Sequence, residues 1–373
     1  MGGMTRGARR TEGAAERSPG LWAARAGVAE RAIRGRHLRR LWGLPGTRLG
    51  VVRRPARLAD RLFARWHYWW QAHLLDCLID AHERAPAAER VEVIGRLIRG
   101  VHLRNLRHWT NDYYDDIAWL GLALHRARDL VDTRPALAEI TARLRDGWTE
   151  HGGGGIWWRR GDTFKNVPAN GPAAILLARA RVERADRQRA RAMAEWMERS
   201  LRDPGTGLMW DGLHVAEDGG VRDVVTTTYT YCQGVYLGAC VELAGHEPAG
   251  PWVGRAARTV RAVEAGLAPD GVLRGHDGGD GGLFTGILTR YLADAAIRLP
   301  AAEGETAARL VTASAEALWD NRGALPGGPL FGPEFARPAD LAGGPEHDLS
   351  VQLSGWMALE AAARLEGRAS MAG

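Results

Sequence analysis

Helical periodicity recurs along almost the whole chain and limits the folds that it can adopt. Apolar residues return at the three- and four-residue spacing of amphipathic helices, and glycine or proline separates these segments. Strand signals are scarce, and a candidate hairpin covers 208–215 and 221–228. Long loops are expected at 151–170, 267–282 and 321–347. We predict helices over 22–42, 59–84, 89–108, 114–131, 136–149, 171–182, 185–202, 229–245, 250–265, 283–298, 303–320 and 348–366.

Five of these helices share a texture of small residues and recur about every 50–65 residues, as in a helical repeat with long loops. Small residues allow helices to approach closely, as an inner ring requires, whereas the helices between them carry more Arg and Glu. We therefore predict an all-α (α/α)6 toroid of six helical hairpins with inner and outer rings. An open helical solenoid is the alternative, but several long loops favour a closed barrel with one active face. The five small-residue segments are 116–124, 170–177, 231–238, 282–288 and 348–355.

The toroid places chemistry-bearing residues at one end. Several polar segments lie at or just before the N-termini of the predicted inner helices, and in a toroid those termini meet at one mouth. Converging helix N-termini make a mouth electropositive, which helps to hold a carboxylate. The segments are Asp115–Asp116, Lys165–Asn170, Tyr229–Gln233, Asp280–Phe284 and Asp348.

The 373 residues suffice for one large domain. We expect a disordered Arg/Gly-rich tail over 1–20 and a single helical domain over 21–373. Residues 1–60 carry 14 Arg and four acidic residues, so the net charge of +6 belongs to this segment. Such a basic arm can bind nucleic acid or anionic lipid. A solvated helix face with a frayed tail is the simpler explanation, and no specific nucleic-acid partner is expected.

The cysteines and the hydropathy pattern indicate a cellular compartment. The chain has three cysteines, an odd number, and each lies in an apolar helical run: Cys77, Cys232 and Cys240. We therefore expect them to be reduced and to lie in the core. No metal-ligand spacing is present in the sequence. No apolar run of 18 residues predicts a transmembrane helix, and the N-terminus lacks the apolar stretch of a secretory signal. These features favour a cytoplasmic protein, and they leave its oligomeric state open.

Two adjacent carboxylates, Asp115 and Asp116, mark the start of one inner helix. Aspartate caps helix N-termini and complements the helix dipole, so a purely structural role is one explanation. The pair is flanked, however, by Tyr113, Tyr114 and Trp119, and sugar rings stack on aromatic faces. Adjacent like charges also repel, a cost that a simple cap does not need. A nucleophile beside a proton donor is what cleavage of a glycosidic bond requires.

Four motifs occur in order. They are Tyr113-Tyr114-Asp115-Asp116-x-Ala118-Trp119, Gly153-Gly154-Gly155-Ile156-Trp157-Trp158, Lys165-Asn166-x-Pro168-Ala169-Asn170-Gly171-Pro172 and Thr230-Tyr231-x-Gln233-Gly234. Together they resemble glycoside hydrolase family 76, which contains endo-acting α-1,6-mannanases with an (α/α)6 fold. The resemblance covers roughly residues 59–366. It implies an α-mannoside oligosaccharide, polysaccharide or glycolipid as substrate, and neither a metal nor an organic cofactor.

The resemblance also implies a retaining mechanism in which Asp115 is the nucleophile and Asp116 the general acid/base. Retaining enzymes separate their carboxyl groups by about 5–5.5 Å, which side chains diverging from Cα atoms about 3.8 Å apart can reach. The motifs supply further candidates for substrate binding. Packing of the aromatic residues and capping by Asn170 are the structural alternatives. The candidates are Tyr114, Trp157, Trp158, Lys165, Asn166, Asn170, Tyr231 and Gln233.

The chain departs from the family pattern at two positions: Cys232 replaces an asparagine and Thr285 replaces a lysine. Two other functions therefore stay open. One is a carbohydrate-binding (α/α)6 protein without turnover. The other is a sugar epimerase or isomerase of the same fold, which would use His residues as acid and base. The scattered positions of His67 and His108 show no such pair in the sequence.

Overall fold

Six helices form the inner ring of the molecule and six pack outside them. The computed structural model describes residues 20–180 and 184–372, so the predicted tail lies outside the described residues except for Gly20. The inner helices are α3 (Tyr68–Arg84), α5 (Tyr114–Ala127), α7 (Val167–Ala180), α9 (Thr230–His246), α11 (Phe284–Arg298) and α13 (Leu349–Ala372). The outer helices are α1 (Leu21–His37), α4 (Ala88–Arg104), α6 (Arg134–Asp146), α8 (Arg184–Leu201), α10 (Trp252–Leu267) and α12 (Ala301–Asp320).

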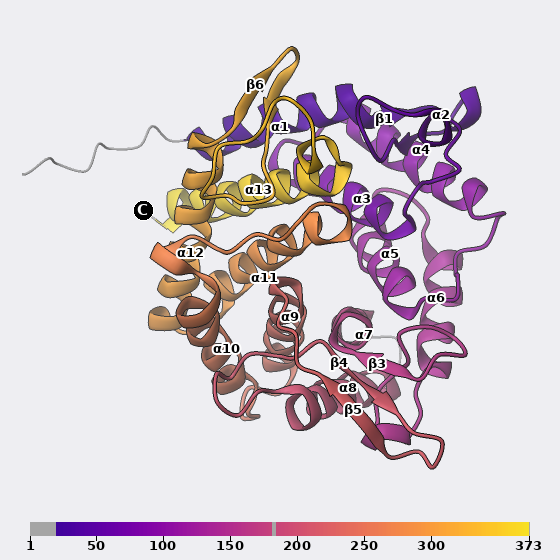
Figure 1. The fold of residues 1–373 in the computed structure, drawn as a ribbon, viewed down its shortest axis with the longest axis vertical. Helices are drawn as coiled ribbons and strands as arrows, with labels where there is room; N and C mark the ends of the chain where they lie inside the picture. The colour runs from indigo at the N-terminus through magenta and orange to yellow at the C-terminus, as the bar shows by residue number, and fades with distance from the viewer. Residues whose placement is uncertain (1–19, 181–183, 373) are drawn as a thin grey trace, which may run out of the picture.

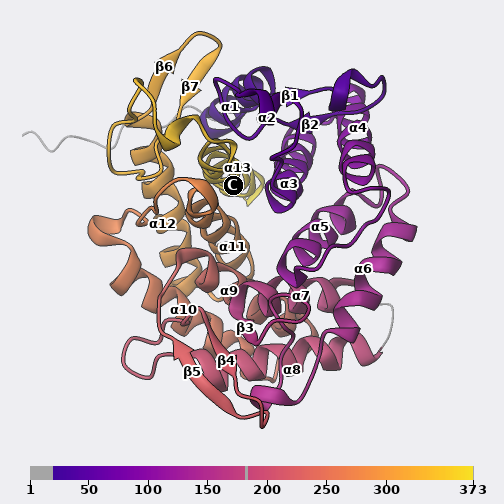
Figure 2. The ribbon, with the colours of Figure 1, turned by 45° about the vertical axis from the view of Figure 1, so that its right-hand side comes forward.

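The inner ring is closed. Each inner helix packs against the next one along the chain, and α13 packs against α3. The colours in Figures 1 and 2 accordingly run once around the molecule, until yellow α13 lies beside indigo α1 and α3. Five outer helices pack on the inner helix next to them in sequence, whereas α1 packs mainly on α13. The predicted (α/α)6 toroid is confirmed, and the first and last described helices form its sixth hairpin.

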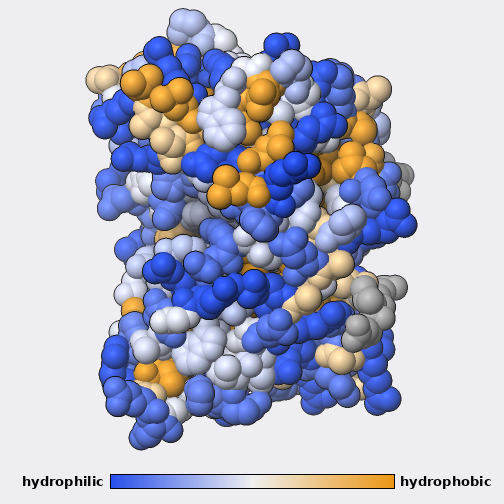
Figure 3. Space-filling view, turned by 90° about the vertical axis from the view of Figure 1, so that its right-hand side faces the viewer, coloured by the Kyte–Doolittle hydropathy of each residue, from blue (hydrophilic) through white to orange (hydrophobic). Residues whose placement is uncertain are grey.

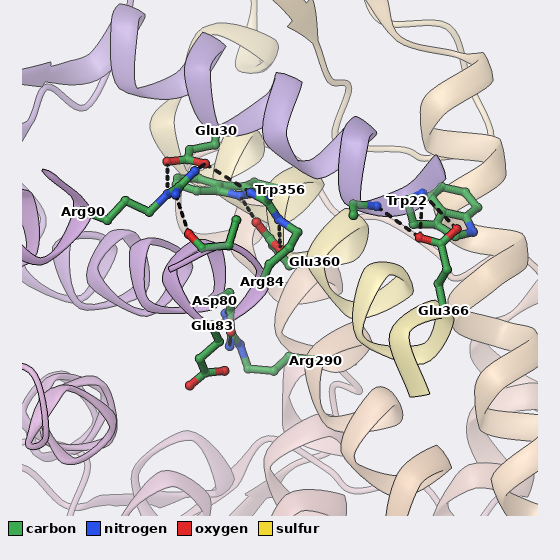
Figure 4. Close-up of polar contacts among 12 residues, drawn as sticks. Trp22, Glu30, Asp80, Glu83, Arg84, Arg90, Arg290, Trp356, Glu360 and Glu366 are labelled. Atoms are coloured by element: carbon green, nitrogen blue, oxygen red, sulfur yellow. Dashed lines mark hydrogen bonds and ion pairs between the residues drawn. The ribbon is translucent and has the colours of Figure 1, made fainter. Parts of the chain in front are cut away.

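A buried ion network holds this closure together. The carboxylate of Glu30, on α1, accepts two hydrogen bonds of 2.8 Å from Arg90 and one of 3.1 Å from Arg84. Arg84 also donates to Glu360 at 2.9 Å, and the other oxygen of Glu360 accepts the Trp356 indole N–H at 2.8 Å. Figure 4 shows these side chains between the helices. One network therefore joins α1, α3, α4 and α13.

Small residues explain how closely the inner helices pack. A Cβ atom on Gly234 of α9 would lie 2.9 Å from the Cα atom of Leu288 on α11. A Cβ atom on Gly286 of α11 would lie 2.5 Å from the Cα atom of Ser354 on α13. Real Cβ contacts are not this short, so only glycine permits these separations. The small-residue pattern in the sequence therefore identified the contact faces of the inner ring correctly.

Short β-strands occur in the segments that connect the helices of the ring. The predicted hairpin is present as β4 (Gly212–Val215) and β5 (Val221–Val225), and β3 (Phe164–Asn166) pairs antiparallel with β4. The segment 151–170 is therefore not a simple loop, because it also contains the start of α7. A second hairpin, β6 (Gly323–Leu325) with β7 (Gly328–Leu330), lies in the expected loop 321–347. None of the helices in 20–180 and 184–372 is both long and apolar enough to span a bilayer.

Two predicted helices are interrupted by turns that periodicity did not indicate. The helix predicted over 22–42 ends at His37, and β1 (Leu38–Arg39) then pairs with β2 (Leu49–Gly50). The helix predicted over 59–84 is divided into α2 (Leu58–Arg61) and α3. Trp42, Phe63 and His67 have φ angles of 48°, 55° and 44°, which a right-handed helix cannot contain. These turns depend on contacts between distant segments, so periodicity did not reveal them.

Candidate active site

The N-terminal ends of the inner helices meet at one mouth, as predicted. Trp70, in the first turn of α3, donates its indole N–H to Asp280, just before α11, at 2.8 Å. The neighbouring Gly279 N–H donates to Asp348, just before α13, at 3.2 Å. At the start of α5, the Tyr114 N–H donates to the Trp158 carbonyl at 2.9 Å. Hydrogen bonds thus join the segments at the starts of α3, α11 and α13, and another joins the start of α5 to the loop that carries Trp158.

Asp115 and Asp116 occupy the first turn of α5 at this mouth. The Asp115 Oδ1 atom accepts the Asp116 backbone N–H at 2.9 Å, and its Oδ2 atom accepts the Trp158 indole N–H at 3.0 Å. The Asn111 amide donates to Asp116 Oδ2 at 2.6 Å and accepts the Tyr113 N–H at 2.9 Å. Each carboxylate is therefore oriented by its own hydrogen-bond donor.

The two carboxyl groups have different proton affinities. Burial raises the pKa of Asp115 to about 7, although two N–H donors oppose the shift. Burial and the neighbouring Asp115 charge raise the pKa of Asp116 well above its usual range, with one opposing donor, Asn111. Asp280 repels the ionised forms of both. Between the two apparent pKa values of this coupled pair, one carboxyl is ionised and the other protonated, as acid/base catalysis requires.

Trp158 and Trp157 point to different surroundings. The Trp158 indole contacts Asp115 and packs edge-on against Tyr113 with 5.2 Å between ring centroids, and the Trp158 backbone N–H donates to the Phe164 carbonyl of β3 at 2.8 Å. The Trp157 ring instead lies 4.5 Å from the Lys165 ammonium and borders a separate recess of about 670 Å³ by the β4–β5 hairpin. Of the two predicted sugar-stacking tryptophans, only Trp158 lies at the aspartate pair.

An aromatic wall extends from the pair. Tyr231 stacks on Phe284 with 3.8 Å between ring centroids and 2° between planes. The centroid of the Trp69 ring lies 6.4 Å from that of Phe284 and 6.5 Å from that of Trp119. Burial raises the pKa of Tyr231, and the Asp115 charge adds to that shift, so its hydroxyl stays protonated. The predicted candidate Tyr231 is therefore part of the mouth.

Tyr114 is not. Its side chain is buried, and its ring packs so closely on Gly147 that a Cβ atom there would lie 2.5 Å from Tyr114 Cε1. Its ring fills the space where α5 meets the end of α6, and the expectation that Tyr114 binds substrate stays a prediction. The aromatic residues around the aspartate pair therefore divide between the mouth and the core.

Lys165 occupies a structural position as well. Its fully buried ammonium donates to the carbonyls of Thr149, His151, Gly154 and Gly155, and to the Thr149 hydroxyl, at 2.7–3.0 Å. Burial lowers the pKa of Lys165 to about 7, and the negative charge of Glu150 opposes this shift. These contacts use all of its hydrogen-bonding capacity, so Lys165 clamps the loop that carries Trp158. The contact between Lys165 and substrate stays a prediction.

Three of the polar residues predicted to contact substrate also form hydrogen bonds with backbone groups. The Asn170 side chain bonds both the N–H and the carbonyl of Ile156, at 2.8 and 3.0 Å, from within α7 rather than as its cap. Asn166 caps that helix instead, accepting an N–H at 3.1 Å. Gln233 bonds the N–H and carbonyl of Met209 at 2.7 and 2.9 Å. All three are buried and hold loops in the structure, and their contacts with sugar stay predictions.

Asp280 and Asp211 were not among the predicted catalytic or substrate-binding residues, although Asp280 begins one of the polar segments expected at the mouth. The Asp280 Oδ1 atom accepts indole N–H groups from Trp69 and Trp70, at 3.0 and 2.8 Å, and 59% of the side chain is exposed. Burial raises the pKa of Asp211 to about 6. The position of Asp280 before an inner helix was visible in the sequence. Only the structure shows that it acts electrostatically on Asp115 and Asp116.

The two departures from the family pattern have different settings. Cys232 is buried with its sulfur 3.8 Å from Asp211 Oδ1. Thr285 is buried, and its hydroxyl donates to the Arg274 carbonyl at 2.9 Å. Cys232 therefore alters the surroundings of a carboxylate that influences Tyr231. Across the described part of the chain, no three His, Cys, Asp or Glu side chains are grouped to hold a metal ion.

Comparison with known proteins places this geometry in context. The model of glycosyl hydrolase family 76 matches residues 30–333. The GH76A α-1,6-mannanase from Salegentibacter sp. HEL1_6 is 31% identical, with a TM-score of 0.82 over 92% of this chain and 99% of that chain. An inactive variant of that enzyme, with two aspartates replaced by asparagine, is solved with α-1,6-mannotriose. The Lin0763 protein from Listeria innocua is 28% identical, with a TM-score of 0.81 over 93% and 98%. No curated protein matches significantly.

Proposed function

Because the chain belongs to glycoside hydrolase family 76, we propose that it hydrolyses α-1,6-mannosidic linkages with retention of the anomeric configuration. Asp115 is the nucleophile and Asp116 the general acid/base. The substrate is an oligosaccharide, polysaccharide or glycolipid that contains α-1,6-linked mannose. The similarity to a mannanase studied with α-1,6-mannotriose supports this choice of linkage.

The mechanism is a double displacement. An Asp115 oxygen attacks the anomeric carbon while Asp116 transfers its proton to the departing glycosidic oxygen, so that a glycosyl–Asp115 ester forms. Asp116, now ionised, removes a proton from water, and that water attacks the anomeric carbon and releases Asp115. Two inversions give net retention. The indole N–H of Trp158 favours the ionised form that Asp115 must have before attack.

The unequal environments of the two carboxyl groups carry this assignment. Asp115 accepts two N–H donors, whereas Asp116 accepts the Asn111 amide and experiences the charge of Asp115. The group with more donors ionises first, and its neighbour stays protonated. Reversing the roles would require the better stabilised carboxylate to hold the proton.

Hydrolysis of α-1,6-mannotetraose tests the proposal, with the anomer of the product followed by NMR. The wild type should release the α-anomer first. Asp115→Asn and Asp116→Asn should each lower kcat by at least about 10³-fold, the range in which catalytic carboxylates act. Asp112→Asn is the matched control, because Asp112 lies in the same segment but its side chain is 56% exposed beside Arg160.

The variants also separate the two roles. A substrate with an activated phenolic leaving group does not need protonation, so it should restore formation of the glycosyl–enzyme in Asp116→Asn but not in Asp115→Asn. Release of the β-anomer would contradict the retaining mechanism. Binding without turnover by the wild type would indicate the carbohydrate-binding alternative, and formation of an epimer or ketose would indicate isomerase chemistry.

A further inference from the structure

Exposed hydrophobic side chains gather on one side of the molecule, over α2 and the C-terminal end of α4. Leu58 and Leu106 are the most exposed, at 72% and 77%. Figure 3 shows the side that carries α4 and α6, with hydrophobic residues concentrated in its upper part. Most of the large exposed hydrophobic residues in the described ranges belong to this group: Trp42, Leu44, Leu58, Leu62 and Leu106.

Hydrogen bonds hold the segments of this group together. The Trp42 indole donates to the Leu62 carbonyl at 2.7 Å, which joins the loop before β2 to α2. Arg104, at the end of α4, donates to the Phe63 carbonyl at 2.7 Å, and Arg99 donates to the Gly46 carbonyl at 3.0 Å. The leucines of three separate segments are therefore presented on one continuous surface.

Arginines surround these hydrophobic side chains. Residues 38–65 contain eight Arg and one acidic residue, Asp60, and residues 96–107 contain four Arg and no acidic residue. Asp60 is buried and accepts the Arg57 N–H at 3.0 Å, so its charge is directed inward. The basic–apolar face consists of these five hydrophobic residues together with the exposed arginines Arg40, Arg57, Arg61, Arg65, Arg99 and Arg107.

The backbone of this face is strained at three positions, Trp42, Leu106 and Arg107, and at the buried Phe63 beside Leu62. Trp42, Phe63, Leu106 and Arg107 have φ angles of 48°, 55°, 55° and 64°. Among the other non-glycine residues in 20–180 and 184–372, only His67 and Asp270 have positive φ angles. Such conformations are unfavourable for non-glycine residues and persist where the surrounding structure enforces them. Outward presentation of Trp42 and Leu106 is therefore costly, which favours a role in binding.

We propose that the basic–apolar face docks the protein onto the surface of an anionic lipid bilayer. Arginines attract acidic headgroups, and leucine and tryptophan side chains enter the boundary between headgroups and acyl chains. Nucleic acid would satisfy the arginines but would leave the leucines in water. Charge complementarity together with exposed aliphatic side chains thus selects a lipid surface over a polyanion in solution.

The face adjoins the mouth of the barrel. A cavity of about 160 Å³ lies between them and is lined by Arg57, Arg65, His67, Trp70 and Asp348, among others. Trp70 contacts Asp280 on the rim of the mouth. A bilayer docked on this face therefore lies next to the mouth, where mannosides attached to lipid would be displayed. The docking itself does not depend on the proposed hydrolysis.

Co-sedimentation of the full chain with vesicles tests this inference. Vesicles of phosphatidylcholine with one quarter phosphatidylglycerol should bind the protein, whereas pure phosphatidylcholine should bind it at least tenfold more weakly. Leu58→Ser/Leu62→Ser/Leu106→Ser should weaken binding at least tenfold. Arg57→Gln/Arg61→Gln/Arg65→Gln should weaken it on the order of a hundredfold, about fivefold for each arginine.

Matched triple variants control for total hydrophobicity and charge. Val221→Ser/Val224→Ser/Leu341→Ser and Arg191→Gln/Arg261→Gln/Arg309→Gln change exposed residues elsewhere, and both should bind like the wild type. Equal binding by the wild type and both face variants would overturn the inference, because another segment would then hold the lipid. Absence of vesicle binding would also overturn it. Loss with the arginine variant alone would overturn it in favour of a soluble polyanion. Hydrolysis of soluble manno-oligosaccharides by the face variants reports separately on the proposed function.

Discussion

The indole nitrogen of Trp158 lies 3.0 Å from Asp115 Oδ2, so the loop before β3 supplies a hydrogen-bond donor to the first turn of α5. Trp158→Phe removes that donor while keeping an aromatic ring. A hydrogen bond to a charged group contributes about 1.5–3 kcal/mol, so the pKa of Asp115 should rise by about one unit or more. The acidic limb of the kcat/KM profile should move to higher pH by the same amount. Trp157→Phe, which changes a ring on the other side of the loop, should leave that limb in place.

The wild-type pH profile should be bell-shaped. Activity should rise as Asp115 loses its proton near pH 7 and fall at higher pH as Asp116 loses its own, because burial raises both pKa values. Measurement of kcat/KM on an α-1,6-mannoside between pH 4 and 10 checks this shape. A plateau that extends to pH 4 would contradict the raised pKa of Asp115.

The same shift predicts a stability effect. A carboxyl whose pKa is raised by folding stabilises the protein while it is protonated, and this contribution is lost as the pH rises from about 4 to about 7. Asp115→Asn should therefore raise the free energy of unfolding at pH 8 by about 2 to 4 kcal/mol and change it little at pH 4. Urea unfolding at both pH values measures the difference. An equal gain at pH 4 and pH 8 would show that ionisation is not its cause.

Lys165→Met should loosen the loop that carries Trp158. The substitution leaves four carbonyls without their donor, and those of Gly154 and Gly155 are buried, so the free energy of unfolding should fall by about 2 to 4 kcal/mol. Chemical unfolding and proteolysis within 149–157 would report the change. Arg199→Met is the control, since it removes one partly exposed bond to Gly153 in the same loop and should cost less than about 1 kcal/mol. Equal losses from the two substitutions would argue against a special role for Lys165.

Glu30→Ala should destabilise the closure of the ring. Its removal leaves the Arg90 guanidinium without a buried carboxylate and takes away one of the two buried carboxylates that contact Arg84, which costs about 3 to 5 kcal/mol. Glu89→Ala removes a carboxylate that is 62% exposed and contacts Arg34, and it should cost about 0 to 1 kcal/mol. Thermal unfolding of both variants provides the comparison. Similar melting temperatures would show that the buried network contributes little.

Local patterns in the sequence predicted the ring but not all of its connections. Helical periodicity and small residues at Gly234 and Gly286 reflect contacts made within each repeat, so they identified the inner helices. The breaks at Trp42 and Phe63 depend on partners elsewhere, such as the bond from Trp42 to Leu62. Strand β3 was missed for the same reason, because its partner β4 lies more than forty residues farther along the chain.

The candidate site was predicted in part. The adjacent carboxylates Asp115 and Asp116 were predicted as the catalytic pair, and the structure places both at the mouth. The motif residues Lys165, Asn170 and Gln233 were expected to contact sugar, but each is buried and bonds backbone groups. A motif records which polar side chains a family uses, without showing whether each faces a ligand or a carbonyl. That distinction depends on side-chain direction, which is a property of the assembled loops.

The pairing of α1 with α13 has a consequence for biosynthesis. Trp22 and its hydrogen-bond partner Glu366 are 344 residues apart, so α1 leaves the ribosome long before the helix that covers it. Until then, the apolar side of α1 and the flank of α3 facing α13 have no native neighbour. The nascent chain therefore forms an open ring with two exposed apolar surfaces, and chaperone binding during translation should concentrate on these two surfaces. In a circular permutant that joins α13 directly to α1, the two helices would be synthesised one after the other. The apolar side of α1 would then be exposed for a shorter time.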